Sequence, residues 1–281
     1  MTAIQLSPAA AESDVLLCKN DHGVVTLTLN RPEQYNALSL ALLTELQAAV
    51  ARLATDESVR VLVIAGAGKA FCAGHDLKEI QGHASPEFEK DVFENARRLM
   101  IALTRLPQPV IARVHGAAYA AGCQLVAQCD LAVAVPEARF AASGVNFGLF
   151  CSTPGVPLAR NVSTKRAMEM LLTGEPIDAA TALAWGLVNR VVPPARLDEE
   201  VLGLARSIMT KSTAVIAAGK KTFYEQIDEN LVQAYRVATA SMLDNLQTED
   251  GKEGVAAFAE KRKPKWTGLD RSKIKSKNRQ V

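Results

Sequence analysis

Two stretches of small residues stand out because each directly follows an apolar run that has the composition of a buried strand. Residues 69–78 contain the sequence Ala-Gly-His at 73–75, and residues 114–124 contain Ala-Ala-Gly at 120–122. Small side chains let backbone N–H groups approach a ligand closely, and a helix N-terminus presents N–H groups without intrahelical partners. One N–H group from each stretch could converge on a carbonyl oxygen. This would be the chemistry of an oxyanion hole.

The same composition has a simpler interpretation. Small residues also allow a strand and a helix to pack tightly, and the spacing does not distinguish tight packing from an oxyanion hole. Neither stretch is a phosphate-binding loop, because the chain has neither GxxxxGK[ST] nor GxGxxG at these positions.

The cysteines and histidines do not indicate a metal site or a disulfide framework. The cysteines are odd in number, lie among small or apolar neighbours and show no CxxC spacing, which favours reduced, buried thiols. The four histidines form no HxxxH pair, so we expect no metal. The five cysteines are Cys18, Cys72, Cys123, Cys129 and Cys151.

Composition and charge describe an ordinary globular protein. The chain has 281 residues, of which 48% are hydrophobic and 22% charged, with a net charge of +2. This balance gives no reason to expect a nucleic-acid partner, and the longest apolar stretches are too short to cross a membrane. Residues 1–14 contain no arginine or lysine, so they match neither a secretory signal nor an Arg-rich transit peptide. We therefore expect a flexible tail over 1–14 and a cytoplasmic protein.

Strands alternate with helices in the first part of the chain, and helices dominate the second part. This order predicts an α/β core over 15–200, a helical C-terminal module over 201–266 and a basic tail over 267–281. Ser39 is the expected N-cap of the first helix. Strands are predicted at 24–30, 59–65, 110–114, 131–135 and 187–192, and helices at 39–53, 91–106, 123–129, 164–172, 178–184, 198–210, 214–225, 230–245 and 248–261.

A set of short motifs in fixed order resembles the enoyl-CoA hydratase/isomerase (crotonase) family. Each motif alone is weak, but together they are specific, and the likeness runs from about residue 15 to 266. The motifs are Leu29-Asn30-Arg31-Pro32, Asn36-Ala37-Leu38, Phe71 to Leu77, His115-Gly116 through Gly122-Cys123, Cys129-Asp130, Phe140, Leu172-Thr173-Gly174 with Ala182, Gly186-Leu187-Val188 and Lys261-Arg262-Lys263-Pro264.

The resemblance implies a fold, a substrate class and an assembly. The fold would be a spiral of ββα units followed by a helical trimerisation module, assembled as a homotrimer or as a hexamer of two trimers. The substrate would be an acyl-CoA thioester, with coenzyme A carried by the substrate and no separate cofactor. By position, the two oxyanion N–H groups would belong to His75 and Ala121.

The resemblance also implies where coenzyme A binds. The backbone near Ala73, His75, Asp76 and Leu77 would hold the adenine. The basic segment from Lys261 to Lys265 would contact phosphates, in some family members from a neighbouring subunit, and Arg31 has a weaker claim to the same role. The alternative for the basic segment is a solvated tail.

The chain departs from the family at the two positions that perform acid–base chemistry. Hydratases of the family use two glutamates there, whereas this chain has Gln124 and Gly144. Glutamine cannot serve as a general base near neutral pH, and glycine has no side chain. The carboxylate used by the isomerases shares the second position and is also missing. Cys151 lies in a loop that could face the acyl pocket, although a buried, inert thiol is the alternative.

Three functional hypotheses remain open at this point. The first is an enzyme of the hydratase/isomerase type, and the second is another reaction of the family, such as decarboxylation of a CoA thioester. The sequence Ala-Gly-His-Asp at 73–76 also occurs in family members that decarboxylate. The third is a non-catalytic acyl-CoA-binding or regulatory protein. We expect His115 to be a hydrogen-bonded structural histidine, and Asp130 and Glu137 to be structural, capping or surface residues rather than an acid or base.

Overall fold

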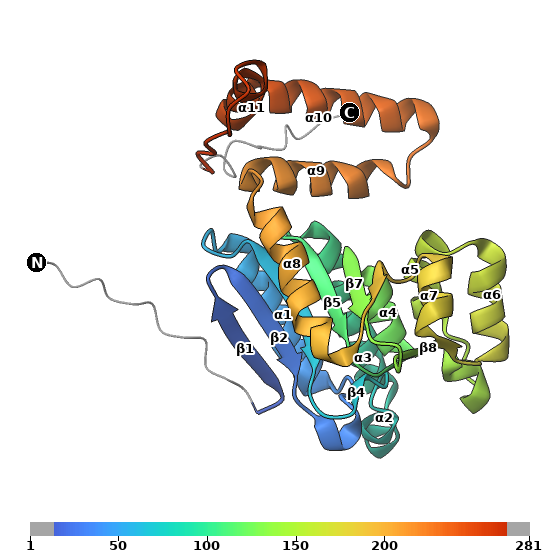
Figure 1. Cartoon of the computed structure of the whole chain (residues 1–281). Helices are drawn as coiled ribbons and strands as arrows, with labels where there is room; N and C mark the ends of the chain where they lie inside the picture. The colour runs from blue at the N-terminus through green and yellow to red at the C-terminus, as the bar shows by residue number, and fades with distance from the viewer. Residues whose placement is uncertain (1–13, 269–281) are drawn as a thin grey trace, which may run out of the picture.

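A six-stranded sheet forms the centre of the molecule (Figure 1). The computed structural model describes residues 14–268, so the predicted tails lie almost entirely outside the described residues. β1 pairs antiparallel with β2 at one edge, and the other strands pair in parallel. In spatial order the strands are β1 (Leu16–Asp21), β2 (Val24–Leu29), β3 (Val61–Gly66), β5 (Val110–Val114), β7 (Leu131–Ala134) and β10 (Arg190–Val191).

A second, four-stranded sheet is built from short strands that follow those of the large sheet along the chain. β4 follows β3, β6 follows β5 and β8 follows β7, and these three short strands pair in parallel. Helices come after each pair, so the chain repeats a ββα unit, which confirms the predicted α/β fold class. The small sheet consists, in order, of β4 (Ala70–Cys72), β6 (Ala117–Tyr119), β8 (Arg139–Ala141) and the antiparallel β9 (Ile177–Asp178).

Helices surround the sheets, and the last three lie together beyond α8, away from the small sheet (Figure 1). Short 3-10 helices are η1 (Pro32–Gln34), η2 (Ser143–Phe147) and η3 (Pro194–Arg196). The α-helices are α1 (Leu40–Thr55), α2 (Leu77–His83), α3 (Pro86–Arg105), α4 (Ala121–Gln128), α5 (Ser152–Asn161), α6 (Thr164–Thr173), α7 (Ala179–Trp185), α8 (Leu197–Met209), α9 (Thr213–Gln226), α10 (Leu231–Gln247) and α11 (Glu249–Ala259).

In the described part of the chain, no helix taken singly has the length and apolar character needed to cross a membrane. The bent pair Pro194–Met209 and Thr213–Gln226 meets the length and composition test only when its two parts are joined across a 103° bend.

Local sequence explains where the main elements begin and what they bury. Ser39 caps α1 as predicted, with its hydroxyl accepting a hydrogen bond from the N–H of Leu42. Leu43, Leu46 and Val50 recur on one face of α1 and are buried in the core. The apolar run of β3 is buried, as expected for a parallel strand covered on both faces.

Two predicted elements differ from the structure. The helix predicted from 91 begins at Pro86, because Ser85 accepts a hydrogen bond from the N–H of Phe88 and proline suits the first helical position. The strand predicted over 187–192 is reduced to two residues, Arg190–Val191, which pair with β7.

Candidate active site

The two small-residue stretches meet at adjacent strands of the small sheet. Gly74 follows β4, and Ala120 and Ala121 follow β6, the neighbouring strand. A Cβ atom on Gly74 would lie 3.0 Å from the Cβ of Ala120 and 3.3 Å from the nitrogen of Ala121. Gly74 also has a φ angle of +103°, which L side chains rarely adopt. Glycine is therefore required here for the two turns to touch.

The N–H group of His75 is free to donate a hydrogen bond to a ligand, whereas the N–H groups of Ala73 and Asp76 already donate to backbone carbonyl oxygens. The N–H of Ala73 donates to the carbonyl oxygen of Tyr35 at 3.0 Å, and the N–H of Asp76 donates to that of Leu38 at 3.2 Å. The N–H of His75 has no acceptor among residues 14–268.

The second turn also leaves one N–H group available. Ala121 is the first residue of α4, and within the described residues its N–H has no acceptor. Ala120 before it has φ 47° and ψ −116°, an unusual conformation for an alanine. Backbone strain of this kind costs about 1–3 kcal/mol and tends to cluster at functional sites. The strained residue fixes the direction of the helix N-terminus at this turn.

Gln124 lies on α4 one turn after Ala121 and is 5% exposed. Its Oε1 atom is buried and has no hydrogen-bond partner in the described part of the chain. The first of the two positions at which the resemblance implies a glutamate therefore carries a neutral amide, and it lies on the helix that begins at the available N–H group.

Gly144, at the second of these positions, is closely covered by its own loop. Its N–H donates to the Sγ atom of Cys151 at 3.1 Å. A Cβ atom at Gly144 would lie 2.3 Å from the carbonyl oxygen of Leu149 and 2.8 Å from the Sγ atom of Cys151. No side chain fits here without movement of the backbone, so a glutamate is excluded from this conformation of the loop.

Cys151 has the environment of an inert thiol. It is 7% exposed, and burial raises its pKa, an effect that the hydrogen bond from Gly144 opposes only in part. A reactive cysteine needs a depressed pKa. The geometry therefore favours the second of the two interpretations of Cys151, the buried neutral thiol.

The imidazole of His75 is neutral at physiological pH. Burial lowers its pKa to about 4, and the ring lies 4.8 Å from that of Phe93, centroid to centroid. Its Nε2 atom is buried and has no partner within residues 14–268. The side chain thus adds no charge next to the N–H group of the same residue.

The residues predicted to bind coenzyme A fall into two groups. Ala73 and Leu77 are exposed at the surface beside His75. Arg31 is committed elsewhere: its Nη2 atom lies 2.9 Å from Asp76 Oδ2, and its Nη1 atom donates to the carbonyl oxygen of Ala37 at 2.6 Å. Arg31 is therefore a structural partner of Asp76 rather than a free cation.

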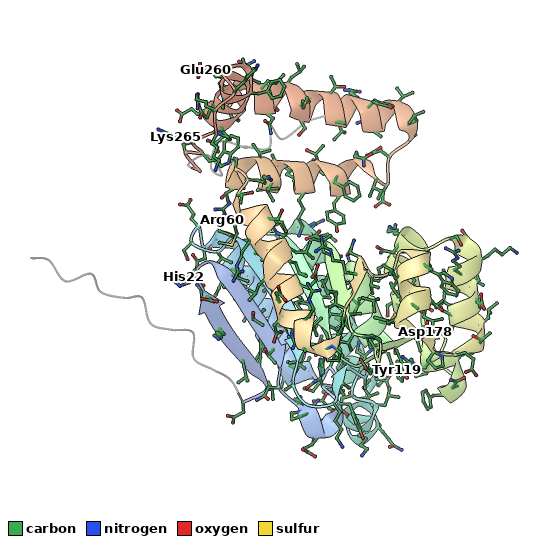
Figure 2. The ribbon with its side chains drawn as sticks, viewed as in Figure 1. His22, Arg60, Tyr119, Asp178, Glu260 and Lys265 are labelled. Carbon is green, nitrogen blue, oxygen red and sulfur yellow. The ribbon has the colours of Figure 1, made fainter. Side chains whose placement is uncertain are left out.

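Lys261 and Lys265 are not brought near His75 within one chain. Both follow α11, and Lys265 appears at the far end of the molecule from Tyr119, the residue that ends β6 (Figure 2). The backbone N–H of Lys265 is held by Glu253 Oε1 at 2.7 Å. The two lysines are exposed, so they could serve only a site reached from another subunit or from solvent.

Of the residues that we expected not to act as acid or base, His115 and Asp130 have structural contacts. A ring nitrogen of His115, Nε2, lies 3.0 Å from the carbonyl oxygen of Gly68. Asp130 joins the core to α9 through Lys220 Nζ at 2.6 Å and the hydroxyl of Tyr224 at 2.8 Å. Glu137 is exposed. Within residues 14–268, no three histidine, cysteine or acidic side chains gather as metal ligands.

Two residues near the site were missed. Glu79 accepts a hydrogen bond from the N–H of Leu40 at 3.0 Å, and Phe93 packs against His75. The helix-start pattern of Asp76 and Glu79 would pair Glu79 with the N–H of Asp76, which here donates to Leu38, so it gave no signal for the bond to Leu40. Nothing in the sequence indicated the contact between Phe93 and His75.

Comparison with known proteins identifies the family. The sequence pattern of the family described as enoyl-CoA hydratase/isomerase matches residues 19–270.

The chain belongs to the enoyl-CoA hydratase/isomerase family.

An enoyl-CoA hydratase domain-containing protein 3, mitochondrial, from Xenopus laevis is 47% identical over 249 residues, 89% of this chain and 85% of that protein. The crystal structure of an enoyl-CoA hydratase from Mycobacterium smegmatis superimposes with a TM-score of 0.88 at 55% identity, covering 90% of this chain and 99% of that one. The human enoyl-CoA hydratase domain-containing protein 3 gives 0.87 at 46% identity, covering 90% and 100%. The crotonase fold implied by the motifs is therefore confirmed.

The predicted cytoplasmic location is contradicted by these comparisons. The relatives from Xenopus laevis, rat, human and mouse are all named mitochondrial proteins. The prediction rested on the composition of residues 1–14, which tests only for particular kinds of targeting segment at that place. It is wrong for the family members that this chain resembles.

Proposed function

We propose that this chain is an acyl-CoA thioester-processing enzyme that stabilises a thioester enolate on the N–H groups of His75 and Ala121. One observation carries the proposal. The two turns touch at Gly74, and each leaves one N–H group without an acceptor among the described residues. Membership of the enoyl-CoA hydratase/isomerase family, whose members act on acyl-CoA substrates, supports the choice of ligand.

The two N–H groups would act on the charge that develops during the reaction. When an acyl-CoA forms an enolate, negative charge accumulates on the thioester oxygen, and preorganised donors stabilise that charge more than they stabilise the neutral carbonyl. Loss of one such donor typically costs about 10²–10³ in rate. The neutral His75 ring is compatible with this role, because the donor is the backbone.

The sharpest test removes only one N–H group. Incorporation of lactic acid in place of Ala121 replaces the N–H with an ester oxygen, and Ala121→Pro removes it by ordinary mutagenesis, since proline is tolerated at the first helical position. Isotope-edited infrared spectroscopy of bound butyryl-CoA labelled with ¹³C at the carbonyl reports on hydrogen bonding to that carbonyl.

We expect the wild-type protein to shift the carbonyl stretch to lower frequency, and the ester variant to lose much of the shift. Circular dichroism and thermal unfolding serve as the control for folding. A folded ester variant with the full wild-type shift would show that Ala121 is not a donor.

Decarboxylation of a malonyl-type CoA thioester is the second candidate reaction. It is favoured by the loop around Gly144, which leaves no space for a glutamate side chain at that position. The bond between the α-carbon and the carboxylate breaks, CO₂ leaves, and the electron pair moves through the α-carbon to the thioester oxygen. The enolate then takes a proton from water. This route needs no general base to form the enolate, whereas hydration needs acid–base groups that Gln124 and Gly144 do not supply.

A panel of enoyl-, malonyl- and methylmalonyl-CoA thioesters, with products followed by mass spectrometry, separates the hypotheses. A product lighter than its substrate by about 44 mass units, the mass of CO₂, identifies decarboxylation, and one heavier by about 18, the mass of water, identifies hydration. Tight binding without any product on all three substrates would favour the non-catalytic acyl-CoA-binding protein.

We further propose that the chain assembles as a homotrimer or as a hexamer of two trimers. Large apolar side chains lie exposed on α10 and α11, and such surfaces usually need a partner. A neighbouring protomer could then bring Lys261 and Lys265 to the coenzyme A phosphates. Light scattering that returns a 30.1 kDa particle at micromolar concentration would refute the assembly. The most exposed side chains are those of Leu231, Val232, Tyr235, Met242, Leu243, Val255 and Phe258.

A further inference from the structure

The peptide of His75 is held by a loop from a distant part of the chain. Leu38 forms a parallel bridge with His75: its N–H donates to the carbonyl oxygen of Gly74 at 2.7 Å, and its carbonyl oxygen accepts from the N–H of Asp76 at 3.2 Å. The peptide that contains the His75 N–H and the peptide that follows it are thus both held by one residue. The position of the His75 N–H depends on where the loop over residues 31–39 lies.

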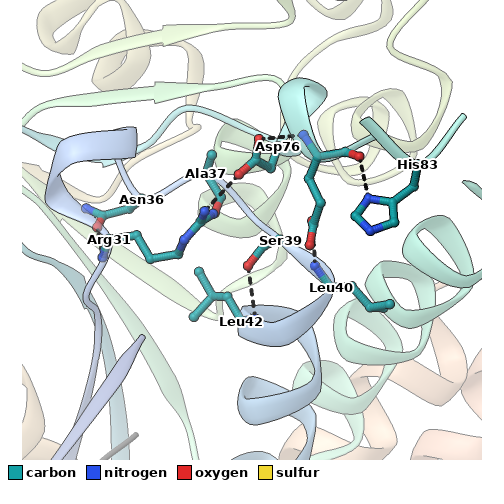
Figure 3. A network of polar contacts seen from close by, with 9 residues as sticks. Arg31, Asn36, Ala37, Ser39, Leu40, Leu42, Asp76 and His83 are labelled. Carbon is teal, nitrogen blue, oxygen red and sulfur yellow. Dashed lines mark hydrogen bonds and ion pairs between the residues drawn. The ribbon is translucent and has the colours of Figure 1, made fainter. Parts of the chain in front are cut away.

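A partly buried ion pair ties this loop to the site. Arg31 Nη2 lies 2.9 Å from Asp76 Oδ2, and the two side chains are 18% and 11% exposed (Figure 3). Arg31 Nη1 donates to the carbonyl oxygen of Ala37, the residue just before the bridge. One guanidinium therefore connects both sides of the bridge through two of its donors.

The second carboxylate oxygen of Asp76 continues the connection into two helices. It accepts the N–H of Glu79 at 3.1 Å and so caps α2. The Glu79 carboxylate in turn accepts the N–H of Leu40, the first residue of α1 (Figure 3). Ser39 caps the same helix. The N-termini of α1 and α2 are thereby fixed to each other and to the ion pair.

A buried asparagine holds the other end of the loop. Asn36 is 0% exposed, and its amide donates to the carbonyl oxygens of Ala67 and Ala70, each at 2.8 Å. Its Oδ1 atom accepts the N–H of Arg31 at 2.9 Å. Because Ala67 and Ala70 flank the turn between β3 and β4, the loop is anchored to the same turn that leads to His75.

We propose that Arg31 and Asp76 form a positioning pair that places the His75 N–H for the thioester oxygen, and that Arg31 is not a ligand of coenzyme A phosphates. The inference rests on the proposed function, since it concerns the donor named there. Neither side chain needs to touch the substrate. An oxyanion donor displaced by about 1 Å can cost about 100-fold in rate, so a pair that fixes the peptide has a large effect at a distance.

The test measures carbonyl polarisation and coenzyme A affinity separately. Arg31→Met removes both guanidinium contacts. Arg31→Lys keeps the charge but cannot reproduce the two-armed geometry. The control is Arg97→Met, which removes an arginine from an exposed ion pair with Glu94 on α3. Each variant is examined by infrared spectroscopy with ¹³C-labelled butyryl-CoA and by calorimetric titration with coenzyme A alone.

We expect Arg31→Met to lose most of the carbonyl shift while its affinity for coenzyme A stays at the wild-type value, and Arg31→Lys to retain part of the shift. Arg97→Met should match wild type in both measurements. On whichever thioester of the panel reacts, Arg31→Met should lower kcat about 100-fold with little change in KM.

A full carbonyl shift in folded Arg31→Met would overturn the positioning role, and so would a loss of coenzyme A affinity that accounts for the whole effect. If Arg31→Met does not fold, Asp76→Asn gives the same test, because its amide keeps the shape and can still cap α2. Absence of any shift in the wild-type protein would instead overturn the proposed function, and this inference with it.

Discussion

The two halves of the candidate site differ in how their backbone is held. In the half formed by residues 31–39 and 73–79, the Arg31 guanidinium, the Asp76 carboxylate and the Asn36 amide all have partners at normal hydrogen-bond distances, and of the buried polar side-chain atoms in this half only His75 Nε2 lacks a partner among the described residues. In the half formed by 120–124 and 143–151, Ala120 is strained, Gln124 Oε1 is buried without a partner among the described residues and Gly144 is covered by backbone.

This difference distinguishes the half that positions the backbone from the half in which acid–base side chains are expected. The first half is built to hold a peptide in place, and it does so with several independent hydrogen bonds. The second half contains Gln124 and Gly144, the positions where the resemblance to the family's hydratases leads us to expect two glutamates, and here it presents an amide and a closed loop. Neither residue has an ionisable side chain that could activate water.

The largest expected effect concerns hydration itself. Each positioned acid–base group contributes about 10²–10⁴-fold, so without both we expect hydration of crotonyl-CoA to be at least about 10⁴-fold slower than in a family member that carries the glutamate pair. The measurement is the loss of the enoyl thioester absorbance. A rate typical of an efficient hydratase would contradict the view that the second half lacks an acid–base group. A carboxylate from another part of the chain would then have to reach the pocket.

The next effect tests whether the second half is closed. Gly144→Glu would place a carboxylate at the second acid–base position, but its Cβ would overlap the carbonyl oxygen of Leu149. We expect the free energy of unfolding in urea to fall by about 3 kcal/mol, without a gain in hydration. Gly203→Ala is the control, because nothing lies within 4 Å of its added Cβ and alanine favours the helix interior. A stable Gly144→Glu protein that hydrates crotonyl-CoA would show that the loop opens readily.

The third effect tests the electrostatics of the first half. Burial raises the pKa of Asp76, but hydrogen bonds from Glu79 and Arg31 outweigh it, and the pKa lies below its ordinary value. A depressed pKa contributes stability above the ordinary value, about 3.9, and this contribution is lost as pH falls through the lower value in the folded protein. Between about pH 5 and 3, wild type should therefore lose unfolding free energy more steeply than Asp76→Asn. Parallel curves for the two proteins would mean that the carboxylate gains nothing from its partners.

Periodicity and turn chemistry predicted much of the fold. Buried strands such as β3 have continuous apolar runs, and α1 has both a cap and an apolar face, so each carries its own local signal. The short strands β4, β6 and β8 have three residues each, too few for a period, and their pairing is set by tertiary structure.

The sequence contains a local signal for the two small-residue turns, and none for contacts between distant partners. Arg31 and Asp76 are 45 positions apart, so no local pattern predicts their pairing. The closure of the loop over Gly144 is likewise a contact between backbone atoms. A sequence shows that a glutamate is absent, but only the structure shows that its space is filled.

The smallest effect sharpens the comparison at Gln124. A buried polar atom without a partner costs about 1–3 kcal/mol, and replacing it with an apolar group of similar shape can recover part of that cost. Gln124→Met should therefore raise the free energy of unfolding by about 1 kcal/mol, because methionine is similar in length and flexible. Asn36→Met, at an amide whose donors and acceptor are all used, should be strongly destabilising in the same urea titration. If Gln124→Met is destabilising to a similar degree, the Gln124 carboxamide has partners in solution and the two halves of the site are paired alike.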